Sequence, residues 1–208
     1  MITGLYAITQ ATDNTAALLS TVTDALRGGA AVVQYRDKSG DVARQHEQAS
    51  ELLRVCHSFN VPLIINDSLR LADLVGADGV HIGRDDGAVR EARIILGADK
   101  IIGVSCYQSL DLALSAQAAG ADYVAFGSFF PSQTKPDAVR ADLGLLRLAV
   151  RDIHVPIVAI GGITLTNASG LIDAGADAIA VISALFDNVD VTATARQFAD
   201  LFIDETED

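Results

Sequence analysis

The chain has 208 residues, half of them apolar, and its 27 acidic and 15 basic residues give a formal net charge of −12. A surface of that average charge repels polyanions, so neither nucleic acid nor an anionic membrane is an expected partner. The two cysteines cannot form a disulfide framework, and we find no secretory signal and no membrane-spanning segment, so we expect a cytoplasmic protein.

Short runs of β-branched and other apolar residues alternate with longer segments along the whole chain. Eight such runs occur, at residues 5–8, 31–35, 62–65, 79–82, 101–104, 122–126, 156–160 and 177–182. Nearly continuous apolar runs are typical of strands buried on both faces, as in parallel sheets. Between them lie segments with apolar residues at helical spacing, for example 16–26, 43–56, 110–119 and 143–150.

A short glycine-containing repeat precedes every second strand. It occurs at residues 28–33, 76–80, 120–124 and 175–179, and it places glycine where a helix should end. Eight evenly spaced strands, each with a helix and no leftover segment, favour a closed (β/α)₈ TIM barrel that forms a single domain over residues 1–208. An open doubly wound sheet is the alternative.

The second strand is followed by two cations in an acidic protein. In a (β/α)₈ barrel the chemistry lies at the carboxyl ends of the strands, so Arg36 and Lys38 would stand at the barrel mouth. Two cations there can bind a phosphate group. The plainer alternative is a solvated loop in which they pair with Asp37.

Carboxylates follow the third and fourth strands. Asn66, Asp67 and Ser68 end one strand, and Asp85 and Asp86 follow the other. Carboxylate oxygens together with substrate phosphate oxygens are the usual ligands of Mg²⁺. Alternatively, Asp67 or Ser68 caps the next helix, and the acidic pair does the same for its own helix.

Hydroxyl groups follow the fifth and sixth strands. Ser105 could donate to a phosphate or cap the helix that begins near Ser109, and the neighbouring Cys106 has no histidine that the sequence can place beside it. The loop at residues 127–136 is long and bracketed by prolines. Between Pro131 and Pro136 it holds two hydroxyls and one cation, a polar density that favours substrate contact.

The seventh and eighth strands end in residues that suit a phosphate. Gly161 and Gly162 follow one strand and Ser183 follows the other. The loops after these two strands form a recurrent phosphate site in barrels of this type. We interpret His46, His57 and His154 as surface or packing residues, whereas His81 lies in a strand and could face the barrel lumen.

The chain resembles the thiamine-phosphate synthase (thiamine-phosphate pyrophosphorylase) family over almost its whole length. The order and spacing of the matching segments make the resemblance specific. These segments are Gln34-Tyr-Arg-Asp-Lys38, Ile65-Asn-Asp67, Gly79-Val-His-Ile-Gly-Arg-Asp-Asp86, Gly103-Val-Ser105, Pro131-Ser-Gln-Thr-Lys135, Ile160-Gly-Gly-Ile163 and Val181-Ile-Ser183.

The resemblance implies a transferase that condenses hydroxymethylpyrimidine diphosphate with thiazole phosphate in the presence of Mg²⁺. The residues implied for the pyrimidine diphosphate are Gln34, Tyr35, Arg36, Asp37, Lys38, Asn66, Ser105 and Lys135, of which Arg36, Lys38 and Lys135 act in catalysis. Those implied for the thiazole phosphate are Ser132, Gln133, Thr134, Gly162, Ile182 and Ser183, and Ser132 stands where the family usually has threonine. Asp67 and Asp86 would bind the metal, with Asp85 beside them as a competing carboxylate.

Three other kinds of function compete with this interpretation. A sugar-phosphate isomerase or epimerase would need an acid and a base that face each other across the lumen, and such a pair is not evident at the strand ends. A thiazole phosphate tautomerase needs a phosphate site but no metal, and His81 would be its acid or base. A non-catalytic barrel that only binds a phosphate ligand would lack the lysine or a metal carboxylate, and this chain has both. In every case we expect small molecules as partners, whether the chain acts alone or as a homo-oligomer.

Overall fold

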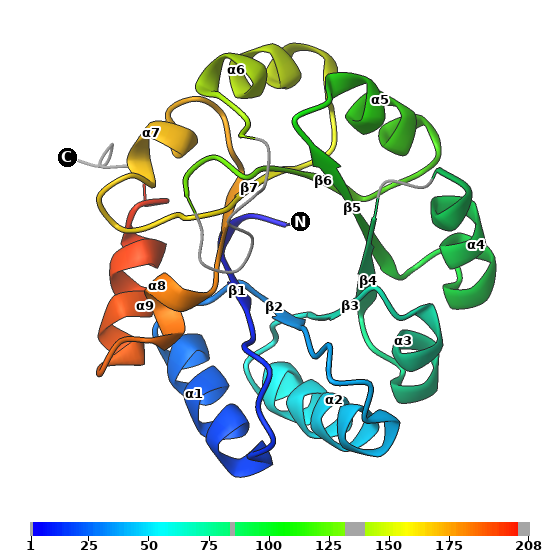
Figure 1. Ribbon diagram of the computed structural model, residues 1–208, viewed down its shortest axis with the longest axis vertical. Helices are drawn as coiled ribbons and strands as arrows, with labels where there is room; N and C mark the ends of the chain where they lie inside the picture. Colours follow the sequence, from blue (N-terminus) through cyan, green and yellow to red (C-terminus); the bar gives the residue numbers. More distant parts are fainter. Residues whose placement is uncertain (1, 84–85, 132–139, 204–208) are drawn as a thin grey trace.

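A computed structural model describes residues 2–83, 86–131 and 140–203. Eight parallel strands form a closed barrel in sequence order, with β8 paired to β1, and the helices form an outer ring around them (Figure 1). The predicted (β/α)₈ barrel is therefore confirmed. Among the described residues, no helix is long and apolar enough to cross a membrane.

The strands agree closely with the apolar runs of the sequence. They are β1 (Gly4–Ile8), β2 (Val32–Tyr35), β3 (Leu63–Asn66), β4 (Gly79–Ile82), β5 (Ile101–Tyr107), β6 (Tyr123–Phe126), β7 (Ile157–Ile160) and β8 (Ala178–Val181). The outer helices are α1 (Thr15–Arg27), α2 (Val42–Ser58), α3 (Leu69–Val75), α4 (Asp86–Leu96), α5 (Leu110–Ala118), α6 (Leu143–Asp152), α7 (Ser169–Ile172), α8 (Ser183–Phe186) and α9 (Val191–Asp200).

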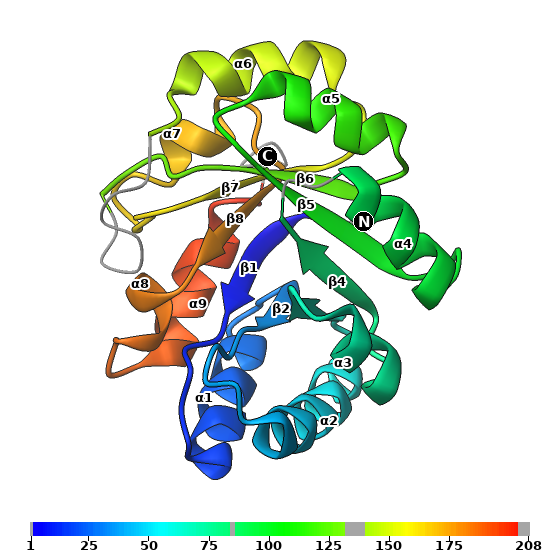
Figure 2. The ribbon, with the colours of Figure 1, turned by 45° about the vertical axis from the view of Figure 1, so that its right-hand side comes forward.

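One short helix departs from the expected pattern of one helix per strand. The four-residue α8 stands between β8 and α9, directly after the end of the last strand. The sequence predicted an apolar run up to residue 182, but the strand ends at Val181 and the chain turns at Ile182. Strand β8 is thus followed immediately by a tight turn at the barrel mouth (Figure 2).

The glycine-containing repeat ends helices, as predicted. Gly76, Gly120 and Gly175 all have positive φ values, of 70°, 95° and 104°, a conformation that glycine adopts without steric cost. In the first copy of the repeat it is Gly29, with φ 101°, that adopts this conformation.

The aspartate of the repeat has a second role that the sequence did not reveal. The carboxylates of Asp78, Asp122 and Asp177 accept hydrogen bonds at 2.7–2.8 Å from the backbone N–H groups of Leu63, Ile102 and Ile157. Each of these aspartates precedes an even-numbered strand and binds the start of the odd-numbered strand before it. The repeat therefore fastens strands together in pairs at the end of the barrel where the strands begin.

Two apolar layers hold the barrel together. One lies between the strands and the helices, and the other fills the lumen with residues such as Tyr6, Ile64, Tyr123 and Val158. Along β4, Val80 and Ile82 belong to the outer layer, so the intervening His81 faces the lumen because side chains alternate along a strand. The lumen is thus a packed core that contains polar side chains.

Candidate active site

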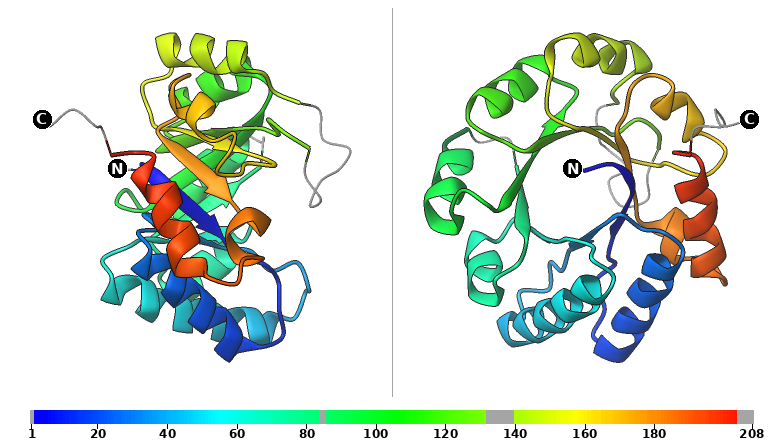
Figure 3. Two further views of the ribbon diagram at one scale, coloured as in Figure 1. Left: turned by 90° about the vertical axis from the view of Figure 1, so that its left-hand side faces the viewer. Right: turned by 180° about the vertical axis from the view of Figure 1, so that it is seen from behind.

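The carboxyl ends of the strands lie together at one end of the barrel (Figure 3). The sequence predicted the chemistry there, so the positions of the predicted residues at this mouth decide what the site can do.

In the loop after β2, the two cations Arg36 and Lys38 do not pair with Asp37, which lies between them in the sequence. The carboxylate of Asp37 is almost fully buried, accepts from Ser39 at 2.8 Å and lies 3.7 Å from Arg44 of α2. Within the described parts of the chain, the half-buried Arg36 guanidinium has no carboxylate partner. The alternative in which Asp37 neutralises the two cations is therefore wrong, and Arg36 can bind an anion.

Lys38 of the loop after β2 forms a cluster at the mouth with Asn66, the last residue of β3, and with Asp67, which follows it directly. The Lys38 Nζ atom lies 3.6 Å from Asp67 Oδ2, and Asn66 Nδ2 donates to the same carboxylate oxygen at 2.7 Å. The side chains of Lys38 and Asp67 are both more than half exposed. A phosphate ligand would therefore meet a cation and a carboxylate side by side.

The conformation of Asp67 argues against a capping role for it. Its φ is 62°, in the left-handed region that non-glycine residues seldom adopt, and such strain is typical of functional sites. The N-cap of α3 is Ser68, whose side chain accepts from the backbone N–H of Leu71. One of the two residues proposed as a cap thus caps the helix, and the Asp67 carboxylate stands at the mouth.

Adjacent residues of β2 face opposite sides of the barrel wall. Gln34 is buried and its Nε2 donates to the Tyr6 hydroxyl in the lumen at 2.8 Å. Tyr35 faces the helix layer, where its hydroxyl donates to Gln48 of α2 at 2.9 Å. Of these two predicted residues, only Gln34 points its side chain into the barrel.

A chain of hydrogen bonds crosses the lumen from Gln34 to Ser105. The Tyr6 and Tyr123 hydroxyls are 2.7 Å apart, and the Tyr123 hydroxyl is 2.9 Å from His81 Nδ1. His81 Nε2 is in turn 2.8 Å from Ser105 Oγ. Burial raises the pKa of both phenols, so each keeps its hydrogen at neutral pH.

Sequence reasoning missed Tyr6 and Tyr123 because both stand in apolar runs. The signal that could have found them is chemical: a tyrosine inside a barrel lumen needs a partner for its hydroxyl. The alternative in which Ser105 caps the next helix is wrong, because the N-cap of α5 is Ser109, whose side chain accepts from the backbone N–H of Leu112. Cys106 is fully buried in the outer layer, on the opposite face of β5.

The ends of β7 and β8 present backbone rather than charge. Gly161 and Gly162 have φ values of 104° and 62°, and a Cβ atom on Gly162 would overlap the carbonyl of Pro131 in the loop after β6. Ile182 precedes α8 and Ser183 begins it. Among the described residues, no backbone oxygen accepts from the N–H of Gly162 or Ile182.

Several predicted residues cannot be placed. Ser132, Gln133, Thr134 and Lys135 lie outside the described residues, as does Asp85, and of Asp86 only the backbone position at the start of α4 is described. The described residues contain no cluster of three or more metal-ligating side chains. The mouth thus contributes one described carboxylate, that of Asp67, to the predicted metal site.

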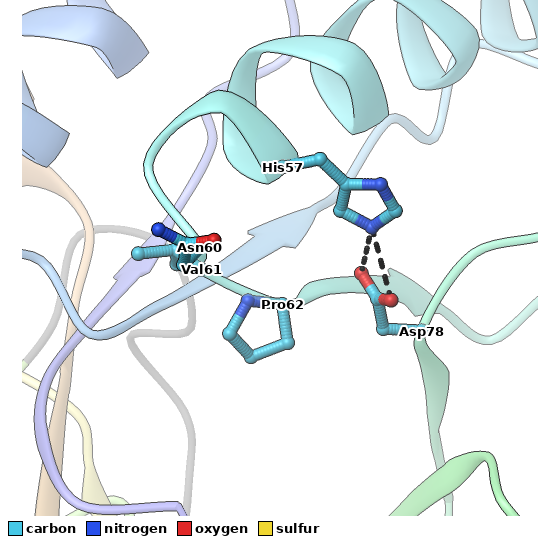
Figure 4. A pocket seen from close by; sticks show the side chains of 5 residues that line it. All are labelled: His57, Asn60, Val61, Pro62 and Asp78. Atoms are coloured by element: carbon cyan, nitrogen blue, oxygen red, sulfur yellow. Dashed lines mark hydrogen bonds and ion pairs between the residues drawn. The ribbon is translucent and has the colours of Figure 1, made fainter.

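At the opposite end of the barrel there is a pocket whose polar lining residues bind other groups of the protein. It is lined by His57, Asn60, Val61, Pro62 and Asp78 (Figure 4). His57 Nε2 lies 3.0 Å from both carboxylate oxygens of Asp78, which also accepts from the backbone of Leu63. His57 is therefore a surface residue that pairs with a structural aspartate, as its helical position predicted.

Comparison with known proteins gives a consistent result. A family model described as thiamine monophosphate synthase matches residues 5–185. The thiamine-phosphate synthase of Thiobacillus denitrificans is 64% identical over 205 residues, covering 99% of this chain and 97% of the relative. The enzyme of the same name from Methylobacillus flagellatus is 55% identical and covers 97% and 96%. A solved structure, the thiamine phosphate pyrophosphorylase of Pyrococcus furiosus, matches with a TM-score of 0.85 and 34% identity over 95% of this chain and 94% of that one.

Proposed function

The chain belongs to the thiamine monophosphate synthase family, and we propose that it joins hydroxymethylpyrimidine diphosphate to thiazole phosphate, giving thiamine phosphate and diphosphate. The observation that carries this proposal is the pairing of Lys38 with Asp67 at the barrel mouth, where Arg36 also follows β2 and has no carboxylate partner among the described residues. A diphosphate requires cations for its oxygens and a carboxylate for its metal. We place this transferase in the cytoplasm, with small molecules as its substrates.

The donor set at the mouth fits Mg²⁺. The Asp67 carboxylate is exposed and held in a strained backbone conformation, and oxygen ligands of this kind are those that Mg²⁺ prefers. Asp67 and Asp86 would bind it. When bound, the metal supplies positive charge that neutralises the diphosphate group.

The side chains of the mouth promote departure of the diphosphate. The bond between the pyrimidine methylene carbon and the diphosphate oxygen breaks, and the electron pair leaves with the oxygen. Arg36, Lys38 and Lys135 stabilise the negative charge that develops there, while Asn66 and Ser105 orient the leaving group. The aminopyrimidine delocalises the resulting cation, and the thiazole nitrogen donates its lone pair to form the new C–N bond.

This substitution needs no protein nucleophile. Cys106, the thiol nearest to the site in sequence, is fully buried on the helix side of β5 and cannot reach the lumen. The contribution of the protein is therefore the positioning of two substrates and the electrostatic stabilisation of one leaving group.

The second substrate would be held at the far side of the mouth. Backbone N–H groups of Gly162 and Ile182 have no backbone acceptor among the described residues, and Ser183 follows Ile182 directly in the chain. These groups suit a phosphate monoester without a metal. Ser132, Gln133 and Thr134 of the loop after β6 would complete this site.

The engagement of His81 argues against a thiazole tautomerase. That reaction would use His81 as its acid or base, but both ring nitrogens lie within hydrogen-bond distance of other side chains, Tyr123 and Ser105. A barrel that only binds phosphate ligands would not require Lys38 and Asp67 together.

The test is diphosphate release from hydroxymethylpyrimidine diphosphate, measured with and without thiazole phosphate and with and without Mg²⁺. We expect release coupled to thiamine phosphate formation, dependent on the metal and on both substrates. Lys135→Ala should lower the rate by orders of magnitude. No release by the folded wild-type protein under any condition would overturn the proposal in favour of the tautomerase or the binding-only barrel.

A further inference from the structure

We propose that Tyr6, Tyr123 and His81 are positioning residues that fix the direction of the Ser105 hydroxyl, so that its hydrogen points toward the diphosphate. This inference rests on the proposed function for the identity of the ligand. The arrangement of the hydrogen bonds within the protein can be tested separately from it.

The hydrogen-bond chain from Gln34 to Ser105 is isolated from water over most of its length. Tyr6 and Tyr123 are 1% and 0% exposed, and Gln34 is 3% exposed. The rings of Tyr6 and Tyr123 meet edge to face, and His81 stacks on Tyr123 with ring centroids 5.6 Å apart. Because solvent cannot supply a partner there, each hydrogen of the chain must find an acceptor within the protein.

The donor at Gln34 sets the direction in which these hydrogen bonds run. Gln34 Nε2 donates to the Tyr6 oxygen. The Tyr6 hydrogen then has the Tyr123 oxygen as its acceptor, and the Tyr123 hydrogen has His81 Nδ1. A neutral His81 ring consequently carries its hydrogen on Nε2 and donates it to Ser105 Oγ.

The opposite direction leaves one hydrogen without an acceptor. If Ser105 donated to His81, and His81 through Tyr123 to Tyr6, the Tyr6 oxygen would accept twice. Its own hydrogen would then find no acceptor among the described residues, at a fully buried position. An unsatisfied buried donor is costly, so the direction that starts at Gln34 is the stable one.

Ser105 is the last member of this series of hydrogen bonds. Its oxygen accepts from His81, and its own hydrogen is not used by any described residue. Ser105 is partly exposed near the carboxyl end of β5, whereas the other side chains of the hydrogen-bond series are buried. The hydroxyl therefore presents a hydrogen-bond donor at the mouth, which is what a charged diphosphate oxygen requires.

Gly103 makes room for this arrangement. Gly103 stands two residues before Ser105, on the same face of β5. A Cβ atom on Gly103 would overlap the ring and the hydroxyl of Tyr123. Glycine inside a strand often marks such a close approach. Ser105 thus contributes the donor, and Gly103 leaves the space for Tyr123, which helps to orient that donor.

The direct test is the tautomer of His81 in the ligand-free wild-type protein. The ring nitrogen that carries hydrogen can be identified by ¹⁵N–¹H NMR on protein labelled at histidine, with His81→Asn to assign the signal among the four histidines. We expect the hydrogen on Nε2. Hydrogen on Nδ1 would overturn the proposal, whatever reaction the protein catalyses.

A double-mutant cycle tests the action through Ser105. We expect Tyr123→Phe to lower kcat by about 10- to 100-fold in the wild-type background, as loss of a supporting residue typically does. In a Ser105→Ala background the same change should have almost no effect, because the group that it orients is gone. Equal effects in both backgrounds would contradict the positioning role.

A stability control separates positioning from general weakening of the fold. Thr194→Val removes a buried hydroxyl on α9 that donates to the Asp190 carbonyl, outside the barrel. We expect it to lower stability and leave kcat unchanged. If the wild type released no diphosphate, the proposed function would fail, while the tautomer measurement would still decide the direction of the chain.

Discussion

At the end of the barrel where the strands begin, Asp78, Asp122 and Asp177 each accept a hydrogen bond from the backbone of a neighbouring strand. At the opposite end, no backbone N–H among the described residues donates to the carboxylate of Asp67, which lies exposed beside Lys38. The same residue type thus serves the fold at one end, and at the other end we propose that it serves a ligand. The sequence distinguishes the two uses, because the structural aspartates stand in a repeat and Asp67 does not.

This contrast extends to the cations. Arg93, near the end of α4, donates to several backbone carbonyls and pairs with Asp122 at 2.7 Å, so it stabilises the barrel. Arg36 at the mouth has no carboxylate partner among the described residues. A cation held at a barrel mouth without an internal counter-ion is available for an anionic ligand.

The largest expected effect on the reaction rate comes from removing Arg36, the cation at the barrel mouth. Arg36→Ala should lower kcat by about 100- to 1,000-fold, the usual cost of removing a group that stabilises charge in the transition state. The midpoint of thermal unfolding should stay unchanged, because Arg36 makes no ion pair in the described structure. Arg54→Ala is the matched control, since within the described parts of the chain that exposed arginine of α2 pairs with Glu51 alone, one turn away. Near-normal turnover in Arg36→Ala would remove it from the leaving-group site.

A smaller effect is expected at the mouth carboxylate. Asp67→Asn keeps the size of the side chain and tolerates the left-handed backbone, but it removes the negative charge. We expect kcat to fall about 10- to 100-fold at a fixed Mg²⁺ concentration and to recover partly when Mg²⁺ is raised. An unchanged Mg²⁺ dependence, measured by titration of the metal in the coupled assay, would exclude Asp67 as a ligand.

A substitution at the end of the barrel where the strands begin should lower the stability of the protein and leave its reaction rate unchanged. Asp78→Ala removes the acceptor for the Leu63 backbone and the partner of His57, so we expect the free energy of unfolding to fall by about 1–3 kcal/mol. The value of kcat should be unchanged. Asp73→Ala on α3 is the control, an exposed aspartate whose carboxylate has no partner among the described residues. Urea unfolding of both variants decides this, and a loss of activity without a loss of stability would contradict the division between the ends.

Most of the fold follows from local patterns that a sequence contains. The eight apolar runs became strands whose ends differ from the predicted ends by three residues at most, because a strand buried on both faces tolerates few polar residues. Helix α8 was missed because four residues leave no periodic pattern. The bond from Asp78 to the backbone of Leu63 was missed for another reason, since it depends on how two adjacent strands are aligned.

The sequence predicted which charged residues lie at the barrel mouth, but it did not predict the hydrogen bonds that cross the lumen. Arg36, Lys38 and Asp67 follow strands directly, and strand ends meet at one rim of a barrel. Tyr6 and Tyr123 are 117 residues apart, and only closure of the barrel brings their hydroxyls together. Tyr35 was implied as a substrate residue by its place in a motif, but the alternation of side chains along β2 turns it toward Gln48.

The smallest expected effect concerns a buried thiol near the structural end of the barrel. Burial and the charge of Asp78 raise the pKa of Cys56 from 9.0 to about 12. In the unfolded chain the thiol ionises near pH 9, whereas in the folded protein it stays protonated, so the folded state binds the proton more tightly. The stability that this provides is fully present below about pH 9 and is lost as the pH rises toward 12.

Between pH 9 and pH 10, this thiol alone should lower the free energy of unfolding by about 1 kcal/mol. The window is useful because Tyr6, Tyr35 and Tyr123, whose pKa values are also raised by burial, contribute mainly above their unfolded value of 10.0. Cys56→Ala lacks the thiol, so its stability should fall less over this window than that of the wild type, even though the variant is less stable at every pH. Parallel pH dependences in the wild type and Cys56→Ala, measured by urea unfolding, would show that the thiol is not coupled to this end of the barrel.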